Sequence, residues 1–394
     1  MTLVFAFGVV LLVAVLVSGL AHRSVLSTTV MFLFAGTGLG SLGFRVVDLN
    51  VRQPVVRDFA VLALFSVLFT DALRIDATQL RRAWRLPARA LLVGMPLTFG
   101  LLTLLARALV GLPWGQALLV AAVLSPTDPV FAAAIVGRSE IPHRLRHLLN
   151  VESGLNDGLA LPVVIVLLAV VDRQAVHVQH LAGELALGVA LGFVIPWVAI
   201  ALERQRWFGS TVKYEPLNAF AIATIVFAAS SLTSANSFLA AFTAGITVAT
   251  FSPAVRDSFR EFGELLSELL KLAAVMIFGA VLTTRMISAV PIGGFVFAIA
   301  ALVLARPAGL QVALVGSQLD WRERAAASWF GPKGFASVVY GLLILESGTP
   351  RSNQLFALIA AVIALSIIAH SSTDVLVAHW FARAESGAVS EGNG

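Results

Sequence analysis

The chain has 394 residues, of which 58% are hydrophobic and 12% are charged. An average soluble protein is about 25% charged, so the composition excludes a large soluble domain and predicts an all-α polytopic membrane protein. The sequence has no cysteine, which excludes disulfides, thiolate metal sites and haem attachment. The net charge of +5 is compatible with nucleic-acid binding. Membrane topology explains this charge better, so we expect no nucleic-acid partner.

Apolar stretches recur along the whole chain, each close to the ~20 residues that a helix needs to cross a bilayer. The first has no basic residue before it and is followed by His22 and Arg23, so it predicts a retained helix rather than a signal peptide. We predict thirteen transmembrane helices, at residues 3–21, 25–43, 58–73, 87–110, 115–136, 146–171, 179–202, 215–234, 236–252, 264–284, 291–315, 323–345 and 353–380.

Lys and Arg are distributed unevenly between the connections of these helices. With the N-terminus outside, the inner connections hold more than twice as many of them as the outer ones. This excess follows the positive-inside rule and predicts a multi-pass protein of the cell (inner) membrane with a cytoplasmic C-terminus. Residues 1–380 are expected to form a single transmembrane domain. Residues 381–394 are short and polar, and are expected to be a disordered cytosolic tail.

The fifth and twelfth predicted helices are interrupted by helix-breaking residues. The first break is Pro126-Thr127-Asp128-Pro129, and the second is Gly331-Pro332-Lys333-Gly334. From Pro87 to Thr127 is 40 residues, as it is from Pro291 to Gly331. Interrupted helices at matching places in two halves predict inverted repeats with a binding site at the breaks. The alternative is a pair of ordinary proline kinks.

The sixth predicted helix carries a polar face in an otherwise apolar segment. At ~100° per residue, Glu152, Ser153, Asn156 and Asp157 fall within one arc of the helix. Their oxygen atoms suit small hard cations. A carboxylate also binds a proton, so Asp157 could exchange one ion for the other. The alternative is a polar stripe that holds helices together.

The first break adds a second acid and free backbone groups. Proline removes backbone donors, so carbonyls near Thr127 become available to a cation or to water. Asp128 is expected to offset the positive end of a half-helix, and Lys333 the negative end at the break in the twelfth helix. Asp128 could instead be the N-cap of the second half of its own helix.

Three further charges lie in apolar surroundings. Arg306 is in the middle of a span and needs a carboxylate, for which Glu152 is the best partner. Lys271 is expected near the inner end of the tenth helix, where its side chain would extend to the surface. Asp71 lies near the inner end of the third helix and either lines an access funnel or caps a helix end.

These motifs together resemble a known family. Thr127-Asp128-Pro129, followed by Glu152-Ser153 and Asn156-Asp157, is similar to the cation/proton antiporters of the sodium/proton exchanger family, in its NhaP-like branch. Arg306-Pro307, the segment 331–334 and the segment Asn236–Gly245 match further landmarks of the family in the same order. The resemblance covers almost the whole chain.

The resemblance implies a thirteen-helix inverted-repeat fold with two crossed discontinuous helices, in a homodimer. Residues 3–110 and 179–284 would contain the scaffold and dimer helices, and 115–171 and 291–380 the ion-binding core. The cation or proton would be carried by Asp157. The positions of the neighbouring and supporting residues also follow from the resemblance: Thr127, Asp128 and Ser153 near the ion, and Glu152, Asn156 and Arg306 holding the site together. Lys333 replaces the arginine of many relatives.

The leading hypothesis is therefore secondary antiport of Na⁺ or Li⁺, or of K⁺, against H⁺. Relatives with Asn-Asp at residues 156–157 are generally electroneutral, which implies one cation for one proton. A cation channel and an intramembrane enzyme are the alternatives, but the sequence has no His-Glu zinc cluster or Ser-His pairing at membrane depth. We expect no enzymatic activity and no cofactor besides the transported ions.

Overall fold

The computed structural model describes residues 2–21, 28–47, 49, 53–74, 83–128, 141–172, 178–205 and 214–391. Within these ranges the regular structure is entirely helical, as the sequence predicts. In chain order, the helices are α1 (Thr2–Ala21), α2 (Thr28–Leu39), α3 (Pro54–Leu73), α5 (Arg85–Arg89), η1 (Ala90–Gly94), α6 (Met95–Val110), α7 (Trp114–Leu124), α9 (His143–Val171), α10 (Val178–Glu203), α11 (Glu215–Leu232), α12 (Ser237–Phe251), α13 (Pro253–Val281), α14 (Thr284–Ser288), α15 (Ile292–Ala300), η2 (Ala301–Ala305), α16 (Arg306–Ala313), α17 (Trp321–Trp329), α18 (Phe335–Ser347) and α19 (Ser352–Glu391).

Six of the described helices are long and apolar enough to cross a membrane. The helices that meet both criteria span Arg85–Val110, His143–Val171, Gln179–Glu203, Glu215–Leu232, Ile292–Ala313 and Ser352–Thr373. Several other apolar helices are shorter, among them α7 and α18, which end or begin at the predicted breaks. The bilayer dictates this architecture, because a helix satisfies its backbone hydrogen bonds without water.

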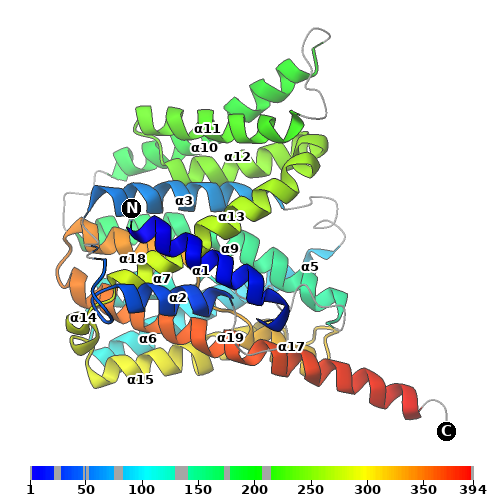
Figure 1. The fold of residues 1–394 in the computed structure, drawn as a ribbon. Coiled ribbons are helices and arrows are strands. Elements are labelled where there is room, and N and C mark those ends of the chain that lie inside the picture. The colour runs from blue at the N-terminus through cyan, green and yellow to red at the C-terminus, as the bar shows by residue number, and fades with distance from the viewer. Residues whose placement is uncertain are drawn as a thin grey trace.

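Two predicted boundaries are wrong. The helix predicted at 264–284 begins at Pro253, because proline is well suited to the first helical position. The prediction missed residues 253–263 because their charged side chains interrupt the hydrophobic run by which the helix was recognised. Figure 1 shows α19 extending beyond the bundle, and it is helical to Glu391. The tail predicted to be disordered from residue 381 is therefore helical over most of its length, since its alanines favour a helix and no proline interrupts it.

An internal repeat is visible in two helices that each contain a π-helical turn. The π-helical segments are η1, within the helix that spans 85–110, and η2, within the helix that spans 292–313. Each segment ends two residues before a proline, Pro96 or Pro307. Each also packs against the other helix, since η1 contacts α16 and η2 contacts α6. A π turn shifts the backbone hydrogen bonds next to the position where proline lacks an N–H. Both halves of the chain therefore have the same local arrangement of a π turn followed by a proline.

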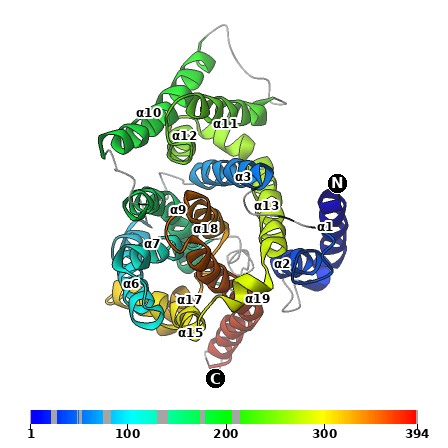
Figure 2. The ribbon, with the colours of Figure 1, turned by 90° about the vertical axis from the view of Figure 1, so that its left-hand side faces the viewer.

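The helices form two groups joined by α3 and α13. Figures 1 and 2 show α10, α11 and α12 together on one side, and α6, α7 and α15 on the other. Between them, α3 packs against α12 and α13. The sequence placed the segment up to residue 110 with the scaffold helices, but α6 packs against α7, α15 and α16. It therefore lies with the helices of the predicted ion-binding core, where η2 packs against it.

Candidate functional site

Both predicted breaks are present and they lie against each other. α7 ends at Leu124 and is followed by non-helical residues to Asp128, while Pro129 and the rest of the predicted half-helix lie outside the described residues. The second break is a non-helical stretch, 330–334, between α17 and α18. The backbone N–H of Asp128 donates to the carbonyl of Pro332 at 2.9 Å. This bond ties the two breaks together at their centres.

Each break also places a charged side chain at the end of a helix that borders the other break. The carboxylate of Asp128 accepts a hydrogen bond at 3.1 Å from the backbone N–H of Phe335, the first residue of α18. Lys333 Nζ donates to the carbonyl of Pro126, just beyond the end of α7, at 3.4 Å. Each charge thus offsets a helix end that belongs to the other break, whereas the sequence placed Lys333 at the negative end in its own break. Gly334 makes this approach possible, because a Cβ there would overlap the carboxylate of Asp128.

The predicted polar face of α9 points to the first break. Glu152, Ser153, Asn156 and Asp157 are all at least 95% buried. Asn156 Nδ2 donates to Thr127 Oγ1 at 2.7 Å. The hydroxyls of Thr127 and Ser153 are 3.2 Å apart. These contacts bring the Thr127 hydroxyl of the break together with the Ser153 hydroxyl and the Asn156 amide of α9, beside a buried acid.

Asp157 differs from every other buried acid of this region. Its backbone carbonyl accepts a hydrogen bond from the Tyr340 hydroxyl at 3.0 Å. Within the described part of the chain, its carboxylate oxygens make no hydrogen bond or ion pair. Its side chain is nevertheless buried, with a relative exposure of 5% for the residue. A carboxylate at such depth requires a cation or a proton to offset its charge.

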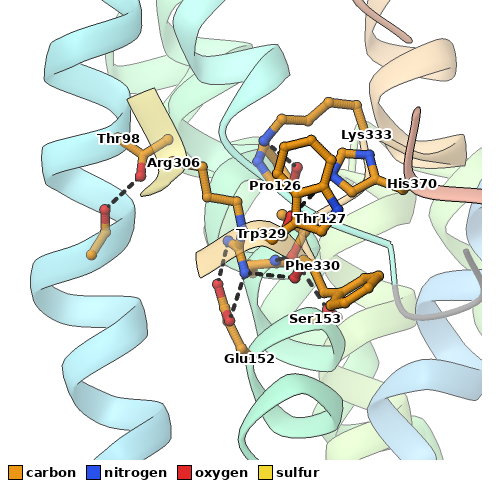
Figure 3. A network of polar contacts seen from close by, with 12 residues as sticks. Thr98, Pro126, Thr127, Glu152, Ser153, Arg306, Trp329, Phe330, Lys333 and His370 are labelled. Carbon is orange, nitrogen blue, oxygen red and sulfur yellow. Dashed lines mark hydrogen bonds and ion pairs between the residues drawn. The ribbon is translucent and has the colours of Figure 1, made fainter. Parts of the chain in front are cut away.

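The predicted pair of Glu152 and Arg306 is confirmed. Arg306 Nη1 donates to Oε1 of Glu152 at 2.7 Å and Nη2 donates to Oε2 at 3.1 Å. Nη2 also donates to the carbonyl of Phe330, at 3.1 Å, so the guanidinium holds the second break as well (Figure 3). Gly331 is required here because a Cβ at this position would overlap the Arg306 side chain.

The prediction for Lys271 is wrong. Its side chain does not reach the surface but is 1% exposed, and Nζ lies 3.2 Å from Asp71 Oδ2 and 3.6 Å from Asp128 Oδ1. α13 begins eleven residues earlier than predicted. Lys271 is therefore ~27 Å along the helix, at 1.5 Å per residue, and too deep to extend to the inner surface. It joins the site as a counter-charge shared by two acids.

Asp71 connects this cluster to a polar cavity. Arg74 Nη1 lies 3.5 Å from Asp71 Oδ1, and Arg74 Nε lies 3.6 Å from Glu264. Arg74 and Glu264 line a cavity of about 250 Å³ between α3, α9 and α13. Asp71 does not line this cavity itself and caps no helix end, since the C-cap of α3 is Arg74. It is separated from the cavity by Arg74, the cavity-lining residue with which it forms an ion pair.

Sequence reasoning missed three further polar residues at the breaks. These are Tyr340, which bonds Asp157, and Ser366 and His370, which contact the second break from α19. Each is at most 2% exposed. Tyr340 is one of only two tyrosines, and His370 follows an apolar run and begins the polar segment 370–374, so polar side chains at membrane depth were the available signal.

A family model for "Sodium/hydrogen exchanger, transmembrane" matches residues 9–379. The chain belongs to this family of membrane transporters. Similar curated relatives are the K(+)/H(+) antiporter NhaP of Alkalimonas amylolytica, 23% identical over 96% of this chain, and the K(+)/H(+) antiporter NhaP2 of Shewanella baltica (strain OS223), 23% identical over 92%. The chain spans 66% and 63% of the length of these two relatives.

The fold of this exchanger-family chain is similar to that of a solved antiporter. The sodium proton antiporter MjNhaP1 from Methanocaldococcus jannaschii, in a structure at pH 8, matches with a TM-score of 0.73 and 19% sequence identity. The match covers 96% of this chain and 97% of that one. The predicted polytopic antiporter fold is thereby confirmed for this family member.

Proposed function

We propose that this chain is a secondary antiporter that exchanges one monovalent cation for one proton at Asp157. The observation that carries the proposal is the contrast between this carboxylate and the charges around it. Glu152 is bonded by Arg306, and Asp71 and Asp128 share Lys271. Asp157 has no such partner among the described side chains, so a cation and a proton would compete for it.

The neighbouring oxygens suit a small monovalent cation. Thr127 and Ser153 bring hydroxyls and Asp128 a carboxylate. Asn156 brings an amide oxygen that has no hydrogen-bond partner among the described residues. Oxygen ligands are those that hard cations prefer. In this proposal Glu152, Arg306 and Lys333 hold the two breaks in position, and Asp71 lies on the inner approach to the site.

Na⁺, Li⁺ and K⁺ are all candidates for the transported cation. The two bacterial relatives are named K(+)/H(+) antiporters, whereas the archaeal structural neighbour is named a sodium proton antiporter. A K⁺/H⁺ antiporter of the same fold is therefore the second candidate. Both cations take oxygen ligands, so cavity size and ligand flexibility decide between them.

The proposed setting is a cell membrane, with the N-terminus outside, the C-terminus in the cytoplasm and two copies in a homodimer. In that setting the exchange would serve pH homeostasis. The basic inner connections support this orientation. Cysteine labelling of single sites introduced at residues 2 and 391, in intact and permeabilised cells, tests the orientation. Labelling of residue 2 only after permeabilisation would reverse it.

The central experiment measures proton movement in proteoliposomes that contain the purified protein. Na⁺, Li⁺ and K⁺ are added separately at several pH values. We expect at least one cation to release protons with saturating kinetics, and its apparent KM to rise with proton concentration while the maximal rate changes little. Cation flux that does not saturate and needs no proton gradient would indicate a channel. No proton movement with any of the three cations would refute the proposal.

A further inference from the structure

His370 and Ser366 lie one turn apart on α19 and face the second break. Both are buried, with exposures of 2% and 0%. Neither belongs to the oxygen atoms gathered around Asp157, and neither side chain carries a charge that the exchange requires. Both side chains instead contact the backbone of the segment 329–333. Figure 3 shows His370 beside Trp329 and Lys333.

His370 holds the beginning of the break. Its Nε2 lies 3.0 Å from the carbonyl of Trp329, the last residue of α17. The last carbonyls of a helix have no partner within the helix, and a carbonyl can only accept, so this contact is a hydrogen bond in the form of His370 whose Nε2 carries a proton. The same carbonyl accepts from the N–H of Gly331 at 2.9 Å, which uses both of its lone pairs.

Ser366 holds the end of the break. Its hydroxyl accepts a hydrogen bond at 2.8 Å from the backbone N–H of Lys333. The hydroxyl is also 3.2 Å from His370 Nδ1, and Nδ1 is 2.8 Å from the Ser366 carbonyl. The imidazole and the hydroxyl therefore fix each other, and together they set the separation between Trp329 and Lys333.

The position of Lys333 matters to the first break. Its Nζ bonds the carbonyl of Pro126, and the preceding residue, Pro332, accepts the N–H of Asp128. A shift of the segment 330–334 would move both contacts and, with them, Thr127 and Asp128. The chain of contacts thus leads from α19 to two of the oxygens proposed to receive the cation.

We propose that His370 and Ser366 are positioning residues of the cation site. They bind no ion. They fix the backbone of the second break so that Pro332 and Lys333 hold the first break in its cation-binding geometry. This inference rests on the proposed antiport, and it predicts that loss of either side chain weakens cation binding more than it slows turnover.

Four variants test the inference in proteoliposomes. His370→Leu removes both ring nitrogens, and Ser366→Ala removes the acceptor for Lys333. His370→Gln keeps an amide N–H near the position of Nε2 and is the conservative rescue. Thr373→Val is the matched control. Thr373 lies on the same helix and accepts a hydrogen bond from the Trp329 side chain at 2.8 Å, but it does not contact the backbone of the break.

We expect His370→Leu and Ser366→Ala to raise the apparent cation KM about three- to tenfold, the range for one lost hydrogen bond, with the maximal rate changed less. The double variant should be little worse than either single one, because both act on one chain of contacts. His370→Gln should recover most of the affinity, and Thr373→Val should stay within about twofold of the parent KM. If His370→Leu does not fold, Ser366→Ala carries the same test.

Two results would overturn the inference. One is an equal fall in maximal rate in all four variants with unchanged KM, which would mark a merely structural role. The other comes from NMR of ¹⁵N-histidine-labelled protein, with His370→Gln used to assign the signal, if Nε2 proved to carry no proton. Failure of the proposed antiport is a separate outcome. If Asp157→Asn still exchanges ions while these variants raise KM, the exchanging residue is wrong and the positioning role stands.

Discussion

Glu152 and Arg306 form a closed ion pair, whereas Lys271 is shared between two carboxylates. The guanidinium makes two bonds to Glu152, at 2.7 and 3.1 Å, and a third to a carbonyl of the second break. The ammonium of Lys271 lies 3.2 and 3.6 Å from Asp71 and Asp128. Both groups are buried in the same part of the molecule, but only the first has short contacts to both oxygens of its acid.

This difference indicates two roles: the Glu152–Arg306 pair stabilises the structure, whereas the acids near Lys271 take part in ion binding. A bidentate arginine uses the rigid fork of its five donors, so the pair is specific in geometry and has no oxygen to spare. A lysine is a point charge on a flexible stem. Lys271 can neutralise its acids without fixing their direction, and their oxygens remain able to turn toward a cation.

The largest effect is expected from the carboxylate that belongs to neither group. Asp157→Asn should abolish cation-driven proton movement, because an amide side chain cannot become negatively charged and does not take up or release a proton near neutral pH. The protein should still insert and fold. Asp172→Asn is the matched control, since it makes the same change at the C-cap of the same helix. Normal exchange by purified Asp157→Asn would refute the assignment.

The next largest effect tests the closed pair. Arg306→Ala leaves Glu152 buried without a partner, which costs about 3–5 kcal/mol of unfolding free energy. Melting temperatures in detergent should therefore fall further for Arg306→Ala and Glu152→Gln than for Asp157→Asn. Arg57→Ala is the control, because Arg57 pairs with Glu346 at 3.6 Å while mostly exposed, and such pairs contribute little. Equal melting temperatures for Arg306→Ala and Arg57→Ala would contradict the structural role.

Removing the shared charge should have a smaller effect, and on affinity. In Lys271→Gln the acids lose a competing positive charge, so the apparent KM for the cation at alkaline pH should fall, by up to about tenfold. Asp71 keeps Arg74, and Asp128 keeps the N–H of Phe335. The melting temperature should therefore fall less than in Arg306→Ala. Lys271→Arg preserves the charge and serves as control. A higher KM in Lys271→Gln would show that the lysine supports cation binding.

The smallest expected effect is that of membrane potential. One carboxylate that exchanges one cation for one proton moves no net charge, and Asn156 is neutral beside it. With the potential clamped by K⁺ and valinomycin, and Na⁺ or Li⁺ as substrate, the rate and the final gradient should not change. A systematic shift with potential would mean that a second group, with Lys271 the first candidate, moves charge during the cycle.

Much of the fold follows from the sequence because the bilayer allows few solutions. Continuous apolar runs must be helices, and Pro126 and Pro332 must interrupt them. The partner of Arg306 was predictable because an unpaired guanidinium at that depth is prohibitive. The π-helical turns were not predicted, since they depend on a single local hydrogen-bond shift.

The remaining site residues depend on contacts between distant segments. Lys271 was misplaced because the amphipathic start of α13 hid the true depth of that residue. Ser366 and His370 bond residues 33 and 41 positions away, and no local pattern marks such pairs. The crossing of the two breaks likewise joins Asp128 to Phe335, which are 207 positions apart. Hydropathy indicates depth along one helix but not which helices meet.

The buried charges around the two breaks also affect whether the protein can change conformation without a bound ion, which would uncouple cation transport from proton transport. Among the buried side chains described there, four acids (Asp71, Asp128, Glu152 and Asp157) face three bases (Lys271, Arg306 and Lys333). Arg74, which is partly exposed, pairs with Glu264 as well as with Asp71 and leaves this difference unchanged. With each group in its usual ionised form, the site carries one excess negative charge, and a bound Na⁺ or H⁺ cancels it. A loaded site is neutral, but an empty one that crossed the membrane field would exchange about 2.3 kcal/mol per 100 mV with it. It would also have to bury an uncompensated charge on the way. Under the proposed exchange, this single negative charge suppresses uncoupled transport. The change between the inward-open and outward-open states has a low free-energy cost only when a cation or a proton is bound.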